Sequence, residues 1–243
     1  MSQVTRINST NTDIGLYSRR LSTGDEQTLV DDFIEYYCNQ FLPKNKKNKL
    51  AVFVEPRIES GFPDIVFASY HPSIIENWSN ERERLDVNDL KILSYLYNVT
   101  GATGVQIISV LGYLGRQTLT SLEKLMDAKL VTYNHNNWRA LRHRDCFSLT
   151  KLVAVEAKLN DINKVIEQAH RNTWFASHSY ALINTASPQN RTLETFTRYG
   201  IGLYTKDKKF IKTVESKRFP LPSSYLSLQF NEWIGREIAH EGG

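Results

Sequence analysis

The chain of 243 residues has only two cysteines, Cys38 and Cys146. They lie far apart in the sequence, so the pattern predicts neither a zinc-finger type of metal site nor a disulfide framework. No apolar run is long enough to span a membrane. The polar start MSQVTRINSTNTD lacks the apolar core of a signal peptide. We therefore expect a cytoplasmic protein that has no membrane partner.

Several motifs of other enzyme classes are also missing. The sequence shows no Ser-His-Asp or Cys-His arrangement and no glycine-rich loop suited to phosphate, and its six histidines have no metal-ligand spacing. It contains no internal repeat and no low-complexity tract. The formal net charge of +4 is compatible with a polyanionic partner but does not identify one.

Strand and helix patterns alternate at both ends of the chain. A helix is predicted to begin near residues 24–25 and to end at Pro43. Residues 50–70 are rich in β-branched and aromatic residues around a Ser-Gly pair, which predicts a hairpin. From residue 146 a strand, a helix, a strand, a short helix and two more strands are expected, followed by a final amphipathic helix. This order indicates an α/β fold.

Residues 85–142 have a different pattern, with three short helices and then a small hairpin. This combination is typical of a winged helix-turn-helix module. We predict a flexible N-terminus (1–24), an α/β core (25–84 and 143–220), an inserted winged helix (85–142) and a C-terminal helix (221–243). The apolar positions expected to face inward in the three short helices are Leu90, Leu93, Leu96, Tyr97, Val105, Ile108, Leu111, Leu119, Leu122, Leu125 and Met126.

The predicted strand LVAVEAK, residues 152–158, carries two charges where burial is expected. Alternate strand residues share a face, so Glu156 and Lys158 point the same way. A buried charge is costly unless it is paired or binds a metal. Asp64 has a similar setting in GFPDIVF, at the start of another apolar strand. Two carboxylates are ligands suited to Mg²⁺ or Mn²⁺, and Lys158 could stabilise a phosphate.

Pro63-Asp64, followed by Glu156-Ala157-Lys158, resembles the PD-(D/E)xK nuclease superfamily. The resemblance covers roughly residues 25–84 and 146–218, and the inserted module occupies most of the long gap between the motif halves. It implies a restriction-endonuclease-like mixed central sheet that is flanked by helices. It also implies that Asp64, Glu156 and the carbonyl of Ala157 bind Mg²⁺ or Mn²⁺, while Lys158 assists attack on the phosphodiester.

Three further residues resemble family sites more weakly. Glu26 shares the inward face of the first helix, which often supplies a glutamate in this family. Gln168, ten residues after Lys158, resembles a helical glutamine seen in several branches of this family. Glu59, in ESGFPD, could also reach the metal across the hairpin.

A winged helix usually lays its third helix in the DNA major groove. The residues expected to meet DNA are Arg116, Gln117, Thr118 and Ser121 on that helix and Arg139 in the wing. The module is only weakly basic, so a role in binding a protein partner is the alternative.

These patterns together predict a metal-dependent DNA endonuclease or nickase. Cutting both strands would require two active sites, so a homodimer or a partner nuclease subunit is plausible. One alternative is a catalytically silent nuclease fold that acts as a DNA-binding or regulatory subunit. Another is a nuclease directed at RNA.

Overall fold

The computed structural model describes residues 3–7, 10–19, 23–73, 78–185 and 187–241 of the chain. The fold is α/β, with a mixed central sheet flanked by helices. The chain forms two compact units, Met1–His71 with Leu149–Ser223 and Pro72–Ser148 with Ser224–Gly243. No helix in the described part of the chain is long and apolar enough to cross a membrane.

The first unit is built on a seven-stranded sheet with the order β1-β2-β3-β6-β7-β8-β9. Strand β3 is antiparallel to both of its neighbours, β2 and β6, whereas β6, β7 and β8 are parallel. The edge pairs are parallel for β1–β2 and antiparallel for β8–β9. The strands are β1 Val4–Ile7, β2 Lys49–Val54, β3 Ile65–Tyr70, β6 Leu149–Lys158, β7 His178–Ile183, β8 Gly202–Lys206 and β9 Phe210–Val214.

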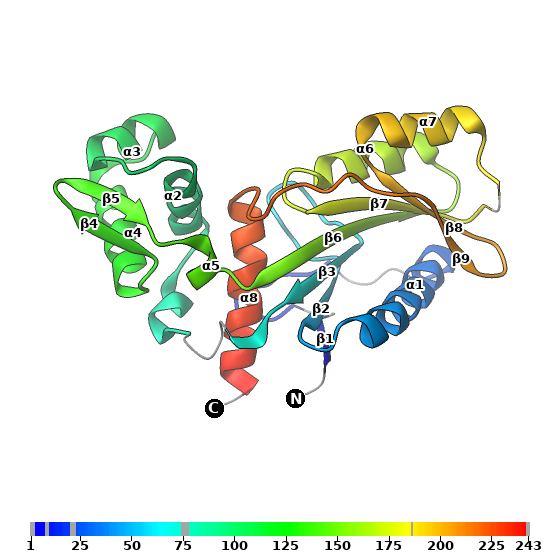
Figure 1. Cartoon of the computed structure of the whole chain (residues 1–243), viewed down its shortest axis with the longest axis horizontal. Coiled ribbons are helices and arrows are strands. Elements are labelled where there is room, and N and C mark those ends of the chain that lie inside the picture. The colour runs from blue at the N-terminus through cyan, green and yellow to red at the C-terminus, as the bar shows by residue number, and fades with distance from the viewer. Residues whose placement is uncertain (1–2, 8–9, 20–22, 74–77, 186, 242–243) are drawn as a thin grey trace. The chain divides into compact units, whose positions relative to one another are not determined.

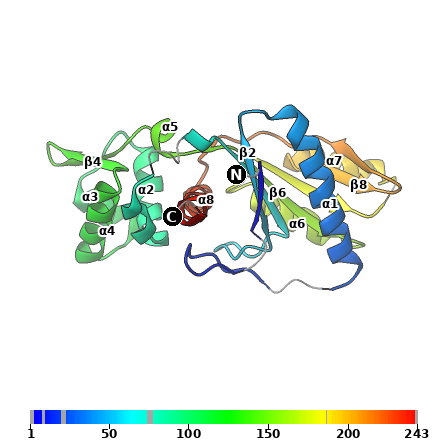
Figure 2. The same cartoon turned by 90° about the horizontal axis from the view of Figure 1, so that it is seen from below.

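Helices cover both faces of this sheet, as Figures 1 and 2 show. Helix α1 (Asp25–Phe41) lies on one face and continues into the 3-10 turn η1 (Leu42–Lys44). It buries Leu29, Phe33 and neighbouring apolar residues against alternate residues of β2, β3, β6 and β7. Helices α6 (Ile162–Asn172) and α7 (Asn190–Tyr199) cover the other face. The predicted start of this helix near residues 24–25 is confirmed.

The N-terminal segment is more ordered than its polar composition predicts. Within the segment predicted to be a flexible N-terminus, Val4–Ile7 pair in parallel with β2. Ile14 and Leu16 are fully buried. The buried side chains of Ile7, Ile14 and Leu16 therefore anchor a segment whose composition is mostly polar. Residues 1–2, 8–9 and 20–22 lie outside the described part.

The second unit contains the three short helices and the two-stranded hairpin that were predicted, together with η3, α5 and α8. Asp86 and Thr103 form capping boxes at the starts of the first two helices, which explains why those helices begin there. The elements are η3 Asn80–Arg84, α2 Val87–Asn98, α3 Gly104–Leu111, α4 Gly115–Asp127, β4 Val131–Asn134, β5 Asn137–Ala140, α5 His143–Cys146 and α8 Tyr225–Glu241.

Two details of this unit differ from the sequence prediction. The C-terminal helix α8 belongs to it, because α8 packs against α2 and η3. Three side chains expected to face inward are exposed instead, namely Val105, Leu119 and Met126. Ile107, Leu122 and Leu125 form the inner stripe. Short helices have few apolar positions, so the choice between adjacent ones is poorly determined by periodicity.

Candidate functional site

The carboxylates of Asp64 and Glu156 lie side by side in the first unit. Ile65 of β3 pairs with Val155 of β6 in antiparallel register, which places Asp64 opposite Glu156. Both residues are buried, at 5% and 2% exposure. The backbone N–H of Ala157 donates to Asp64 Oδ2 over 2.8 Å. Sheet register therefore brings together two acids that are far apart in the sequence.

Helix α6 supplies a partner for Glu156. The side-chain amide of Asn172 donates to Glu156 Oε1 over 2.7 Å. The other oxygen, Oε2, is buried and has no hydrogen-bond partner in the described part of the protein. Gln168 lies one helical turn before Asn172, and its buried Oε1 is likewise unpartnered there. Two buried oxygens thus have unused acceptor capacity on this side of the sheet.

Lys158 ends strand β6 beside the same carboxylates. Its ammonium is 2.6 Å from Glu26 Oε1 in the first turn of α1 and 3.8 Å from Asp64 Oδ2. Glu26 is partly exposed, whereas the side chain of Lys158 is mostly covered. The lysine is therefore held by charge between the helix α1 and the strand-end carboxylates.

Burial and neighbouring charges shift the pKa values of Glu156, Asp64 and Lys158. Burial raises the pKa of Glu156 to about 8, and the charge of neighbouring Asp64 adds to the shift. Burial also raises the pKa of Asp64, against the opposing effect of Lys158. Burial lowers the pKa of Lys158, but Asp64 and Glu26 outweigh this effect, so its net pKa is raised. At neutral pH the lysine is a cation, and Glu156 holds a proton when no cation replaces it.

This arrangement predicts that Glu156 makes stability fall as the pH rises. Its pKa is about 8 in the folded protein, above the ordinary value of 4.5, so folding binds a proton between these values. The contribution is complete below about pH 4.5 and is lost as the pH rises through 8. In urea titrations with EDTA, the free energy of unfolding of the wild type should fall by a few kcal/mol between about pH 4.5 and pH 8, the energy equivalent of the pKa shift. The Glu156→Gln variant should lack this fall. A difference between the two proteins that does not change with pH would contradict this.

Sequence reasoning missed a third carboxylate in the same cluster. Glu55 directly follows β2, is 5% exposed, and donates its backbone N–H to the Asp64 carbonyl over 3.0 Å. Its Oε2 accepts from Arg19 Nε at 2.5 Å. Its φ of 46° lies in the left-handed region, which an ordinary residue occupies at a cost. The glutamate that ends the apolar run AVFVE was the available signal.

The weaker sequence candidates have different positions. Glu26 forms an ion pair with Lys158. Gln168 lies on α6, the helix whose Asn172 donates a hydrogen bond to Glu156. Glu59 is exposed in the turn between Ile58 and Gly61. Glu55 and Glu26 both raise the pKa of Asp64 by their charge, and Lys158 lowers it. Glu59 is therefore a weaker candidate for the cluster than Glu55.

The donor set is suited to a hard divalent cation. In the described part of the chain, no group of three or more His, Cys, Asp or Glu side chains is arranged to hold a metal ion. Mg²⁺, however, usually keeps several waters and takes only one or two carboxylates from a protein. The buried, unpartnered Glu156 Oε2 beside Asp64 fits this requirement. A cation there would also replace the proton that burial otherwise holds on Glu156.

The predicted DNA-contacting residues of α4 and β5 divide into two groups. Thr118 and Ser121 are 1% and 4% exposed, so their prediction as groove-facing side chains is wrong. Thr118 Oγ1 donates to the Leu114 carbonyl, one turn back along the chain. They lie on the inner face of α4 with Leu122 and Leu125. Arg116, Gln117 and Arg139 are exposed.

Comparison of the chain with protein-family models, with curated proteins and with solved structures finds no match.

Proposed function

We propose that the protein is a Mg²⁺- or Mn²⁺-dependent DNA endonuclease or nickase with a restriction-endonuclease-like core. The observation that supports this most is the pairing of Asp64 with Glu156 on adjacent strands, beside the cationic end of Lys158. Their order and strand context are those of the PD-(D/E)xK motif. The sheet itself, mixed in direction and covered on both faces, is compatible with that superfamily.

Each residue of the cluster has a role in this proposal. Asp64 and Glu156 hold the divalent cation, and Asn172 fixes the orientation of Glu156 by its hydrogen bond. Mg²⁺ or Mn²⁺ bound there would neutralise phosphate charge and activate a water molecule. Lys158 is already charged, so it stabilises the negative charge that develops on the attacked phosphate and does not serve as a base. The Ala157 carbonyl completes the predicted ligand set.

The second unit is proposed to dock DNA as an inserted winged helix. Its three helices and the β4–β5 hairpin occur in the order expected for that module. Arg116 and Gln117 are exposed on α4, and Arg139 is exposed on β5. Arginine and glutamine side chains can hydrogen-bond to phosphates and base edges. Thr118 and Ser121 are excluded from this surface by their burial.

Removing Arg116 or Arg139 is expected to weaken duplex binding by a salt-dependent amount. Each lost phosphate contact should lower the slope of log affinity against log salt by about one. The measurement is a fluorescence-anisotropy titration of the alanine variants at several salt concentrations in EDTA. Arg84→Ala is the control, because Arg84 is an exposed arginine paired with Glu81. Equal binding by all four proteins would favour a protein-docking role for this unit.

Cleavage of supercoiled plasmid with Mg²⁺ or Mn²⁺ tests the proposed activity. We expect nicked or linear product, and no product in EDTA. Parallel incubations with single-stranded DNA and with RNA identify the preferred substrate. A folded protein that cuts none of these substrates would overturn the proposal and favour a silent binding subunit.

A further inference from the structure

A polar cavity lies in the first unit, at the opposite end of strands β3 and β6 from the carboxylates. It has a volume of about 560 Å³, which is in the range of small-ligand sites. Ser69 and Thr150 line it, whereas Asp64 and Glu156 lie at the other ends of the same two strands. With a rise of about 3.3 Å per residue, the two places are roughly 20 Å apart. The cavity is therefore separate from the proposed nuclease site.

Strand alternation explains why this cavity is polar. Phe67, Val153 and Tyr180 belong to the apolar face that α1 covers. Two residues along each strand, the same face presents Ser69, Lys151 and His178. Helix α1 ends at Phe41, before the sheet does. Past the C-terminal end of α1, this face of the sheet carries charged and hydroxyl side chains. Apolar side chains would be needed there if a longer helix covered the face.

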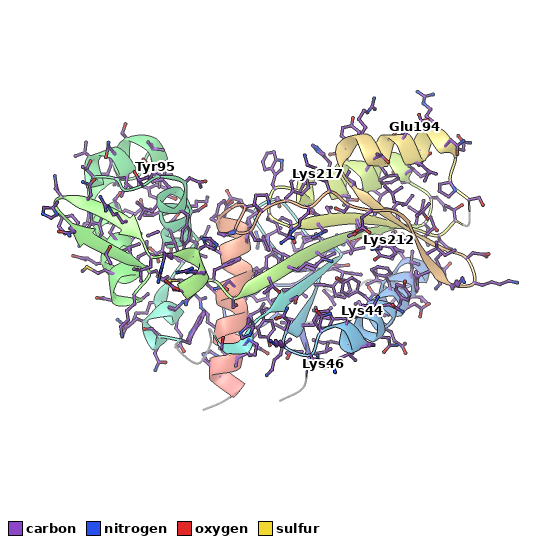
Figure 3. All side chains as sticks on the ribbon, viewed as in Figure 1. Lys44, Lys46, Tyr95, Glu194, Lys212 and Lys217 are labelled. Carbon is purple, nitrogen blue, oxygen red and sulfur yellow. The ribbon has the colours of Figure 1, made fainter. Side chains whose placement is uncertain are left out.

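Four cations line the cavity from four different segments. Lys44 comes from η1, Lys151 from β6, Lys212 from β9, and Arg218 from the chain after β9. Figure 3 labels Lys44 and Lys212 among the side chains of the first unit. Lys212 is paired with Glu215, at 2.6 Å. The four cations of the lining thus outnumber Glu215, the carboxylate that is paired with one of them.

The cations and the histidine disfavour one another's protonation. Burial lowers the pKa of Lys151, and the charges of Lys212 and Arg218 lower it further, while Glu215 opposes them. Burial and the charge of Lys151 lower the pKa of His178 to about 4. Holding like charges together costs free energy that a bound anion would recover. Hydroxyl and amide donors of Tyr36, Gln40 and Asn48 add hydrogen-bonding capacity to the same lining.

We propose that this cavity binds a ligand that carries two or more phosphate charges and is of nucleotide size. Several convergent cations match a diphosphate better than a single carboxylate. The volume leaves room for a group attached to the phosphates beside the Tyr36 and Tyr204 side chains. The ligand chemistry is shared by a free nucleoside diphosphate and by the phosphorylated end of a nucleic-acid strand. The proposal does not depend on the nuclease activity.

Isothermal titration calorimetry tests it, with EDTA present so that no metal-phosphate complex can bind at the carboxylates. The probes are inorganic pyrophosphate, adenosine diphosphate and a 5′-phosphorylated trinucleotide. We expect saturable binding of pyrophosphate that weakens as salt increases. Tighter binding of the nucleotide than of the trinucleotide supports a free ligand, and the reverse order supports a strand end.

Two variants make the site assignment falsifiable. Arg218→Gln and Lys212→Gln remove exposed cations of the lining and should weaken pyrophosphate binding about tenfold each. Lys209→Gln removes an exposed lysine from the β8–β9 turn, outside the lining, and should leave binding unchanged. Circular dichroism confirms that each variant is folded. Absence of saturable binding to the wild type, or equal weakening in all three variants, would overturn the proposal.

Discussion

Lys158→Ala is expected to lower the rate of plasmid cleavage by about 10²–10³-fold, the usual cost of removing one preorganised group that stabilises transition-state charge. The residue is charged and lies 3.8 Å from Asp64. Asp64→Asn should cause a loss at least as large, because it removes half of the carboxylate pair that is proposed to hold the cation. Initial rates of plasmid nicking at saturating Mg²⁺ provide the measurement.

The matched control is Lys206→Ala. Lys206 ends β8 and pairs with Asp32 of α1 at 2.5 Å, much as Lys158 ends β6 and pairs with Glu26 of α1. Both variants therefore break one ion pair between a strand end and the same helix. An equal fall in cleavage rate for Lys158→Ala and Lys206→Ala would show that the loss comes from disturbing the packing of α1. An unchanged cleavage rate in both variants would show that Lys158 has no role in the reaction.

Much of the first unit could be predicted from sequence because its patterns are long and regular. The stripe of α1 has a helical period, and the continuous apolar runs of β2, β3 and β6 are rich in β-branched and aromatic residues, which favours strands. The β1 strand could not be recognised in this way, since Val4–Ile7 is short and alternates among polar neighbours. Its position was fixed by pairing with β2, a long-range contact that the local pattern does not contain.

The candidate site shows the same division between local and long-range information. Asp64 and Glu156 could be identified because each lies in or beside an apolar strand, where a buried charge is costly unless it is paired or binds a metal. Arg19 and Asn172 could not, because an arginine in a loop and an asparagine near a helix end are ordinary residues by local pattern. Their significance comes from Glu55 and Glu156, which they contact at 2.5 Å and 2.7 Å. Only the folded chain provides those partners.

The second unit contains the other large expected effect, on stability. Arg82 and Glu232 are both buried, and Arg82 donates twice to the carboxylate, over 2.6 and 3.0 Å. The guanidinium also donates to the Cys146 carbonyl and lies 3.8 Å from the Trp78 ring centre. Glu232→Leu leaves this cation buried without its carboxylate. We expect the free energy of unfolding to fall by about 3–5 kcal/mol.

The double variant Arg82→Met with Glu232→Leu tests whether the unpaired charge causes that loss. Apolar residues of similar size often replace a buried ion pair with little net change, because the cost of desolvating both charges is also removed. We therefore expect the double variant to recover most of the stability in urea titrations followed by circular dichroism. The exposed Arg84–Glu81 pair should contribute at most about 1 kcal/mol when broken by Arg84→Ala. A double variant no more stable than Glu232→Leu would instead show that the shape of the Arg82 side chain, packed between Trp78 and Cys146, stabilises the unit.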